Sequence, residues 1–197
     1  MSLITRFFVA RHGETEWNQY KRLQGRLDSP LTVAGQSQAR NIARQLADSR
    51  IELIVSSTLG RAVHTAKICQ QELAQQWIQD EQLVERDFGD WQSSFFDDLA
   101  DQVLFESVFF RVTEDSPPNG ESGIDCGARI ENALQRLAVT NVEKRILVVT
   151  HGDAIRCLMD RLHAQGQCDA YSQYGNGRIF YLQFCHHQQV LKLVDTE

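Results

Sequence analysis

The sequence predicts an α/β fold, a three-layer α/β/α sandwich in which helices cover both faces of a mostly parallel sheet. Two observations carry this prediction. Short apolar runs alternate with segments whose apolar residues recur at helical spacing, and the chain closes on two neighbouring apolar runs. With 197 residues, of which 42% are hydrophobic, the chain can bury one core without disulfides or metals.

The first half of the chain starts with a strand over Ile4 to Ala10 and a polar, glycine-containing loop that reaches Pro30. The next segment is helical, because its apolar residues share one face: Ala39, Ile42, Ala43, Leu46 and Ala47. A second strand is expected over Ile51 to Val55. The helix after it has its own apolar face: Ala62, Ala66, Cys69 and Leu73.

The second half repeats this alternation. A weak strand is expected over Trp77 to Val84 and a clear one over Arg145 to Thr150. The helix between them has an apolar stripe: Ile130, Ala133, Leu134, Leu137 and Ala138. A further helix follows His151, and the runs Arg178 to Phe184 and Val190 to Val194 are expected to pair as a closing hairpin.

One segment, Gln92 to Gly123, breaks the alternation. It is rich in phenylalanine and ends in a turn-forming stretch, Ser116-Pro117-Pro118-Asn119-Gly120. We interpret it as a helical, lid-like excursion at about 92–123 over the edge of the sheet, within a single domain of residues 1–197.

Charge and cysteine content exclude several classes of protein. The 20 Lys and Arg residues against 26 Asp and Glu residues give a net charge of −6, which argues against binding to nucleic acid or anionic membranes. Five scattered cysteines without a Cys-x-x-Cys pair indicate neither a disulfide framework nor a thiolate metal site. No apolar run is long enough for a signal peptide or a membrane span. We therefore expect a soluble protein of the reducing cytoplasm.

Polar residues follow four of the predicted strands. Arg11 and His12 come after the first, Arg61 lies just beyond the second, Glu85 ends the third, and His151 follows the strand at Arg145 to Thr150. Because ligands of open α/β sheets bind at the carboxyl ends of the strands, we expect these side chains to converge in one site.

This combination of side chains favours phosphoryl chemistry. Arginine guanidinium groups match phosphate oxygens with paired hydrogen bonds. A histidine beside fixed cations stays neutral, so a ring nitrogen of His12 can attack phosphorus. The leaving oxygen then needs a proton, which Glu85 can supply if its carboxyl group is kept protonated by limited solvation or by the bound dianion.

Several motifs, in this order along nearly the whole chain, closely resemble those of the histidine phosphatase superfamily, the phosphoglycerate-mutase-like proteins. They are Arg11-His12-Gly13-Glu14-Thr15-Glu16-Trp17-Asn18, Gly25 with Asp28-Ser29-Pro30-Leu31-Thr32-Val33-Ala34-Gly35, Ser56-Ser57-Thr58-Leu59-Gly60-Arg61-Ala62-Val63-His64-Thr65-Ala66, Glu85-Arg86-Asp87-Phe88-Gly89-Asp90-Trp91, Asn119-Gly120-Glu121-Ser122 and Thr150-His151-Gly152. The resemblance implies that His12 is transiently phosphorylated, and that Glu85 donates a proton and then activates water.

The same resemblance implies a set of phosphate-binding residues: Arg11, Asn18, Gln24, Gly25, Arg61, His151 and Gly152. It implies no metal and no other cofactor, because fixed cations and hydrogen-bond donors stabilise the transferring group. The expected partner is a small phosphorylated metabolite. The oligomeric state is left open, with a homodimer as one arrangement.

Three functions remain open at this point. Members of the superfamily are hydrolases or mutases, and the segment Glu85 to Trp91 resembles the phosphatase branch. A mutase would need a more enclosing insertion to keep water from the phosphohistidine. The third function, a phospho-ligand binding module without catalysis, is disfavoured because every matched position keeps the side chain that the chemistry needs.

The substrate is a finer prediction. Chain length, the phenylalanine-rich excursion and the segments Phe88-Gly89-Asp90-Trp91 and Pro118-Asn119-Gly120-Glu121 resemble the α-ribazole 5′-phosphate phosphatases of cobalamin biosynthesis. Rings between Phe95 and Phe110 would stack on the flat base. The alternative is that these rings pack the excursion onto its own domain. Fructose 2,6-bisphosphate, other sugar phosphates and broad specificity stay open.

The remaining histidines receive no catalytic role. His64 is interpreted as structural, with a place at the rim of the site as the alternative, and His163, His186 and His187 show no ligand pattern. Cys157 is expected to pack in the core.

Overall fold

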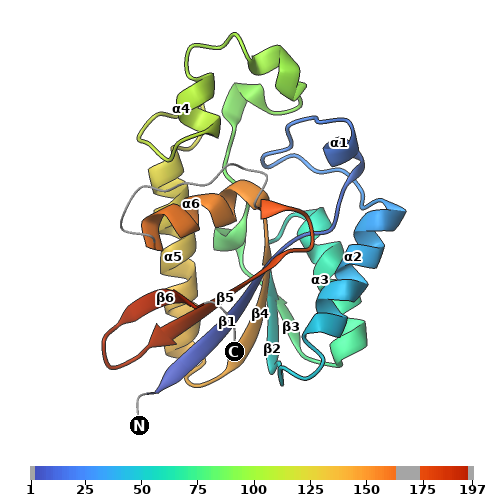
Figure 1. Cartoon of the computed structure of the whole chain (residues 1–197), viewed down its shortest axis with the longest axis vertical. Helices are drawn as coiled ribbons and strands as arrows, with labels where there is room; N and C mark the ends of the chain where they lie inside the picture. The colour runs from blue at the N-terminus through green and yellow to red at the C-terminus, as the bar shows by residue number, and fades with distance from the viewer. Residues whose placement is uncertain (1–2, 163–173, 195–197) are drawn as a thin grey trace.

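The computed structural model describes residues 3–162 and 174–194, in which six strands form one mixed sheet of order β3-β2-β4-β1-β5-β6 (Figure 1). The strands are β1 (Ile4–Arg11), β2 (Leu53–Ser56), β3 (Trp77–Gln79), β4 (Arg145–Thr150), β5 (Ile179–Cys185) and β6 (Val190–Val194). β1, β2, β3 and β4 are parallel, whereas β5 pairs antiparallel with β1 and with β6. The predicted fold class and closing hairpin are confirmed.

Helices cover both faces of this sheet (Figure 1). The α-helices are α1 (Glu16–Gln19), α2 (Val33–Gln45), α3 (Gly60–Leu73), α4 (Phe105–Phe109), α5 (Gly123–Thr140) and α6 (Gly152–Leu162). Short 3₁₀ turns among the described residues include η1 (Glu81–Leu83), η2 (Gly89–Trp91) and η3 (Phe96–Leu99). No helix among the described residues is both long and apolar enough to cross a membrane.

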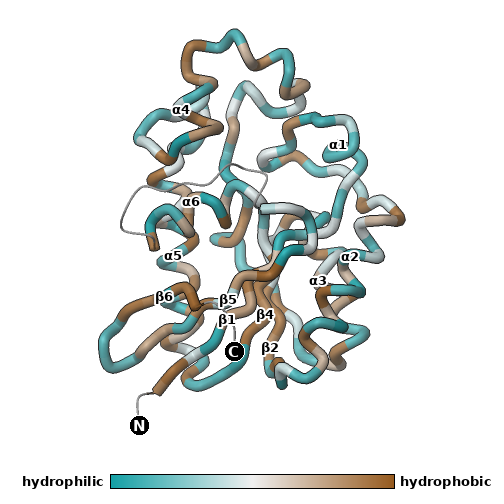
Figure 2. Tube along the Cα trace, in the orientation of Figure 1, coloured by the Kyte–Doolittle hydropathy of each residue, from teal (hydrophilic) through white to brown (hydrophobic). Residues whose placement is uncertain are grey.

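The period-two geometry of β1 explains the three layers. Phe7 and Val9 belong to the core on the side of α5 and α6, whereas Phe8 and Ala10 belong to the core on the side of α2 and α3. All four residues are buried, and Figure 2 shows the central strands as the hydrophobic middle of the molecule. Burial of each large side chain contributes about 1.5–3 kcal/mol to folding. The sheet therefore gives the site a rigid base.

Two sequence predictions of local structure were wrong in detail. β3 ends at Gln79 rather than at Val84, because the Asp80 carboxylate accepts from the Gln82 backbone N–H at 2.9 Å and starts η1. Glu85 consequently follows a 3₁₀ turn rather than ending a strand. The loop after β1 also contains the short helix α1, whose capping Thr15 bonds to Asn18.

The excursion at 92–123 contains η3 and α4 and lies above the carboxyl ends of the parallel strands (Figure 1). Its rings form a separate apolar cluster in which Phe109 packs on four aromatic neighbours: Phe88, Trp91, Phe96 and Phe105. Most of these rings thus pack the excursion onto the protein, which was the alternative interpretation of the phenylalanine-rich sequence.

Candidate active site

His12 lies one residue beyond β1, and its ring nitrogen Nδ1 is 2.7 Å from the carbonyl oxygen of Gly13. Because a carbonyl can only accept, Nδ1 carries the proton and Nε2 keeps its electron pair. Burial first, then the charges of Arg61 and Arg11, lower the pKa of His12 well below 6.5. The ring is therefore neutral near pH 7, and Nε2 can act as a nucleophile.

Gly13 lets the loop that carries His12 pass close against α2. A Cβ at Gly13 would lie 2.2 Å from the carbonyl oxygen of Gly35, and one at Gly35 would lie 2.0 Å from that of Glu14. The Gly13 backbone N–H also donates to Thr65 Oγ1 of α3 at 3.0 Å. Both helices thus fix the position of His12, and a side chain at Gly13 would displace it.

Arg61 is the second residue of α3 and is buried. Asp28 caps this helix by accepting from the backbone N–H groups of Gly60 and Arg61. Acceptors on the loop between α1 and α2 fix the guanidinium group: Gly25 O at 2.6 Å, Leu27 O at 2.7 Å and Asp28 Oδ1 at 3.0 Å. The Nε of Arg61 donates to Nε2 of His12 at 3.2 Å. A fixed cation therefore faces the nucleophilic nitrogen.

Arg11 and Asn18 lie beside His12. Arg11 is buried, and its Nη1 donates to the carbonyl oxygen of Tyr174 at 2.7 Å. The side-chain oxygen of Asn18 accepts from the Thr15 backbone N–H at 3.1 Å and from Asn176 Nδ2 at 3.3 Å. The amide nitrogen of Asn18 is consequently the end that can donate to an anion.

His151 follows β4, and the centroid of its ring lies 5.2 Å from that of His12. Its Nε2 is 2.7 Å from Ser57 Oγ, and its buried Nδ1 has no hydrogen-bond partner in the described part of the chain. Burial first, then the charge of Arg61, lower its pKa well below 6.5. When the Ser57 hydroxyl donates to Nε2, Nδ1 carries the ring proton and can donate to an anionic oxygen.

Glu85 is buried, and its carboxyl group faces the start of α6. It accepts from the backbone N–H groups of Arg86 at 3.0 Å, Ala154 at 2.8 Å and Asp153 at 3.3 Å. Burial raises the pKa of Glu85 most, and the charge of Asp153 raises it further, against a lowering by Arg61. The net effect is a raised pKa, so the carboxyl group of Glu85 stays protonated to higher pH than a carboxyl group in water does.

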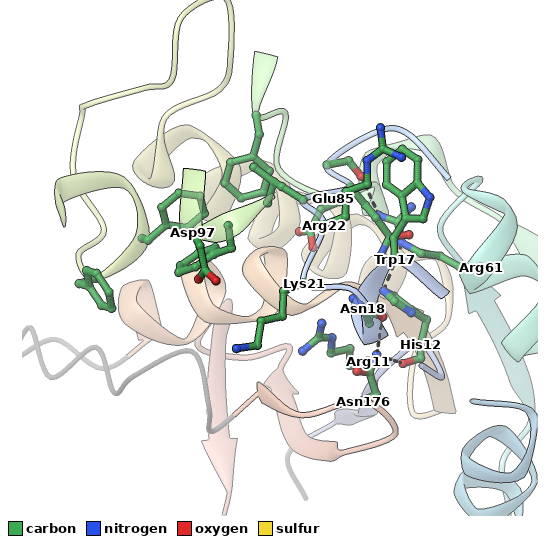
Figure 3. A pocket seen from close by; sticks show the side chains of 17 residues that line it. Arg11, His12, Trp17, Asn18, Lys21, Arg22, Arg61, Glu85, Asp97 and Asn176 are labelled. Carbon is green, nitrogen blue, oxygen red and sulfur yellow. Dashed lines mark hydrogen bonds between the residues drawn. The ribbon is translucent and has the colours of Figure 1, made fainter. Parts of the chain in front are cut away.

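Most of these residues line a cavity of about 530 Å³ (Figure 3). Of the sequence-predicted site residues, those on its wall are Arg11, His12, Asn18, Gln24, Gly25, Arg61 and Glu85. Gln24 accepts from Ser29 Oγ at 3.2 Å. His151 and Gly152 are not among the lining residues found in the described chain; both are buried at the start of α6.

Other residues of the cavity wall were not among the predicted site residues: Trp17, Lys21, Arg22, Phe88, Asp97 and Asn176. Two of them, Trp17 and Phe88, do belong to the family motifs. Most of these residues lie on irregular segments without a periodic pattern. The Nδ2 of Asn176 donates to the carbonyl oxygen of His12 at 3.0 Å, so the loop before β5 supports the nucleophile. Its place between two glycines, Gly175 and Gly177, was the available sequence signal. In Figure 3, Asp97 lies at the opposite end of the cavity from His12.

His64, His186, His187 and Cys157 are absent from this cavity wall. His64 is exposed on α3, and the ring of His186 lies 2.9 Å from Thr5 Oγ1. Cys157 is buried in the core, as predicted, and His163 lies outside the described residues. Among the described residues, no three His, Cys, Asp or Glu side chains are grouped so as to hold a metal ion.

Residues 7–196 match the model of the histidine phosphatase superfamily, branch 1. The chain belongs to this superfamily. The match covers almost the whole sequence and confirms the predicted family, and with it the prediction of a phosphatase-class enzyme.

The proteins that this chain resembles are named for several different activities. A protein of Enterobacter sp. (strain 638), named a probable phosphoglycerate mutase GpmB, is 36% identical over 157 residues, 79% of this chain and 73% of the relative. The structure of mycobacterial glucosyl-3-phosphoglycerate phosphatase in complex with VO3 has a TM-score of 0.83 at 26% identity, over 98% of each chain. An Escherichia coli protein described as a candidate alpha-ribazole-5'-P phosphatase has a TM-score of 0.79 at 27% identity, over 96% of this chain and 94% of that one.

Proposed function

We propose that this protein hydrolyses a small phosphorylated metabolite through a phosphohistidine at His12. One observation carries the proposal. A neutral imidazole with Nε2 unprotonated faces the guanidinium of Arg61 in the same cavity as the buried carboxyl group of Glu85. A nucleophile, an anion-binding group and a proton donor are the three components that phosphoryl transfer needs.

In the first step, Nε2 of His12 attacks the phosphorus atom and the bond from phosphorus to the ester oxygen breaks. The proton of Glu85 moves to that oxygen, so the product leaves as a neutral alcohol. Arg11, Arg61 and His151 bind the oxygens of the transferring group, and Asn18 adds an amide donor. In the second step, the Glu85 carboxylate takes a proton from water, the water oxygen attacks phosphorus, and the bond from phosphorus to nitrogen breaks. Orthophosphate and the starting enzyme result.

The specific substrate that we propose is α-ribazole 5′-phosphate. The cavity wall is rich in aromatic rings, which come from Trp17, Phe88, Phe96, Phe109 and Phe110. Such rings stack favourably on a flat bicyclic base, with about 0.5–1.5 kcal/mol per pair beyond area burial. The similarity to the candidate Escherichia coli phosphatase supports the same choice.

A specific observation also favours a second candidate, an acidic sugar phosphate. Lys21 and Arg22 line the cavity, and only the acidic residues Glu85 and Asp97 share that wall within the described chain. A cation there would bind the carboxylate of a phosphorylated sugar acid. The relatives named for phosphoglycerate chemistry support this candidate, either as a hydrolase or as a mutase.

A turnover screen separates these substrates. We expect release of orthophosphate from α-ribazole 5′-phosphate with kcat/KM at least about tenfold above the values for 3-phosphoglycerate and fructose 2,6-bisphosphate, a difference of about 1.4 kcal/mol. Equal or lower efficiency on α-ribazole 5′-phosphate would remove the cobalamin assignment. Isomerisation of 3-phosphoglycerate without phosphate release would show a mutase.

The chemistry is tested with p-nitrophenyl phosphate and His12→Ala. Quenched wild type should contain an acid-labile, alkali-stable phosphoenzyme. The variant should lose both this phosphoenzyme and the hydrolysis of the ester. His64→Ala is the matched control, because this histidine is exposed on α3 and absent from the wall of the cavity. Equal rates for wild type and His12→Ala would reject the catalytic function in favour of a binding module.

A further inference from the structure

Beside the cavity, three charged side chains are buried together: Arg86, Asp153 and Arg156. Each is 1% exposed. Asp153 joins the two arginines, with Oδ2 at 3.3 Å from Arg86 Nη1 and Oδ1 at 2.5 Å from Arg156 Nε. Burial of such a cluster costs several kcal/mol per ion, and an apolar replacement is often equally stable. Stability alone therefore does not explain why three charges are buried here, and we call this group the buried cluster.

The side chains of the buried cluster bind the backbone of the excursion. Val108 O of α4 accepts from both arginines, from Arg86 Nη1 at 2.9 Å and from Arg156 Nη2 at 3.0 Å. Arg156 Nη1 also donates to Arg111 O at 3.2 Å, and Arg86 Nη2 donates to Asp115 O at 3.1 Å. The carbonyls of Val108 and Arg111 flank Phe109 and Phe110, which line the cavity. The buried cluster thus sets the position of the aromatic wall.

The backbone of the same residues binds the proton donor. The N–H groups of Arg86 and Asp153, with that of Ala154, hold the carboxyl group of Glu85. Arg86 and Asp153 therefore contact Glu85 through their backbone N–H groups, while their side chains belong to the buried cluster. Any shift of the buried cluster would therefore move Glu85 relative to the aromatic wall.

We propose that the buried cluster holds Glu85 and the aromatic wall in one fixed relation, and so positions the leaving group of the substrate against its proton donor. The inference rests on the phosphatase function proposed above. It makes the three cluster residues positioning residues, since they act through Glu85 and through α4. A substrate that stacks on Phe110 is then presented with its ester oxygen toward Glu85.

Electrostatics adds an independent connection to Glu85. The charged groups around this carboxyl include Asp153 from α6, Arg61 from α3 and Arg129 from α5, whose Nη2 donates to the Glu85 backbone carbonyl at 3.4 Å. Among them, only the charge of Asp153 raises the pKa of Glu85, and the arginines that bind Asp153 keep its own pKa low. The cluster thus favours a charged Asp153 beside a protonated Glu85.

The first test is Arg156→Lys. Lysine keeps the charge beside Asp153, but it cannot donate to Val108 O and Arg111 O with a planar fork. We expect kcat/KM for benzyl phosphate, an aromatic ester with a poor leaving group, to fall about 10- to 100-fold through misplacement. The value for p-nitrophenyl phosphate, whose leaving group needs little protonation, should change less than about threefold. Arg161→Lys, an exposed ion-pair residue of α6, is the matched control.

The second test is Asp153→Asn. Because removal of this charge lowers the pKa of Glu85, the alkaline limb of kcat/KM for benzyl phosphate should move to lower pH, while the p-nitrophenyl phosphate profile should not. Equal losses on both substrates in Arg156→Lys, or an unshifted limb in Asp153→Asn, would overturn the proposal. If one variant does not fold, the other decides, and if neither folds, the buried cluster is only structural. If wild type hydrolyses neither benzyl phosphate nor p-nitrophenyl phosphate, the proposed function itself is rejected.

Discussion

The Nε of Arg61 lies 3.2 Å from Nε2 of His12, and the remaining nitrogens of the same guanidinium are bonded to the loop before α2. The arginine cannot move far without breaking these bonds. It therefore disfavours protonation of His12 Nε2 and presents N–H groups where phosphoryl oxygens would lie. The loop acceptors, rather than the helix alone, give this cation its position.

Arg61→Lys tests this relation. We expect kcat/KM for phosphomonoesters to fall about 10²- to 10³-fold, because an ammonium group cannot reproduce the planar fork of donors around the transferring group. Steady-state kinetics of phosphate release measures the loss. Arg40→Lys on the exposed face of α2 is the control and should keep wild-type kinetics. A change of less than threefold in Arg61→Lys would show that this guanidinium does not bind the transferring group.

Glu85→Gln tests the proton donor. The amide keeps the shape of the side chain but cannot donate a proton as an acid, so hydrolysis of an alkyl phosphate should fall about 10²- to 10⁴-fold. Formation of the phosphoenzyme from p-nitrophenyl phosphate should persist, because its leaving group needs little help. A burst of p-nitrophenol followed by slow turnover is the expected signature. Glu106→Gln, at an exposed position of α4, should show neither effect. An equal loss in the rate of leaving-group release from both esters in Glu85→Gln would contradict the assignment.

The convergence of the strand ends could be predicted from sequence because apolar runs mark β1 and β4 clearly. Their register pairs Arg11 with Thr150, which brings His12 and His151 together immediately beyond the sheet. Local periodicity and the direction of parallel strands were sufficient for that step. The argument from fixed cations also gave the correct direction for the pKa of His12, although burial is the larger cause.

The rest of the cavity wall could not be predicted in this way. Lys21 and Arg22 lie on a loop that pairs with the excursion through an isolated bridge between Arg22 and Phe95 and through further backbone hydrogen bonds. Asn176 reaches His12 from 164 positions away. No periodic pattern marks such contacts, because they depend on how two irregular segments pack. The shape of the substrate pocket is decided by that packing.

Burial of neutral histidines makes stability depend on pH. The folded pKa values of His12 and His151 lie below 6.5, so the unfolded chain binds more protons as the pH falls below that value. Their contribution to the free energy of unfolding is present above pH 6.5 and decreases toward the folded pKa. Glu85, with a raised pKa, has the opposite sign: its contribution is present below 4.5 and decreases as the pH rises through its folded pKa.

Comparison of wild type with His12→Asn isolates one histidine. Between pH 6.5 and 5.5, wild type should lose about 1 kcal/mol more unfolding free energy than the variant, because only wild type has this titrating ring. Urea denaturation at both pH values measures the difference. His64→Ala should keep the wild-type dependence, since that ring is exposed. An identical pH dependence in His12→Asn would mean that the buried ring is not neutral in the folded protein.

Phe109 and Phe110 are neighbours on the cavity wall with different exposure, 5% and 54%. Phe109→Ala should destabilise the protein by about 3–5 kcal/mol, because it removes the central ring of the aromatic cluster. Phe110→Ala should leave the melting temperature nearly unchanged but raise KM for α-ribazole 5′-phosphate about tenfold, since a stacked ring contributes about 0.5–1.5 kcal/mol beyond its buried area.

The comparison substrate for Phe110→Ala is 3-phosphoglycerate, which has no ring to stack and should keep its wild-type KM. Phe95→Ala is the matched control, because Phe95 is similarly exposed, at 50%, and is absent from the described cavity wall. If Phe110→Ala raises KM for both substrates equally, the ring acts on the phosphate end and not on the base. If neither KM changes, the acidic sugar phosphates favoured by Lys21 become the better substrate class.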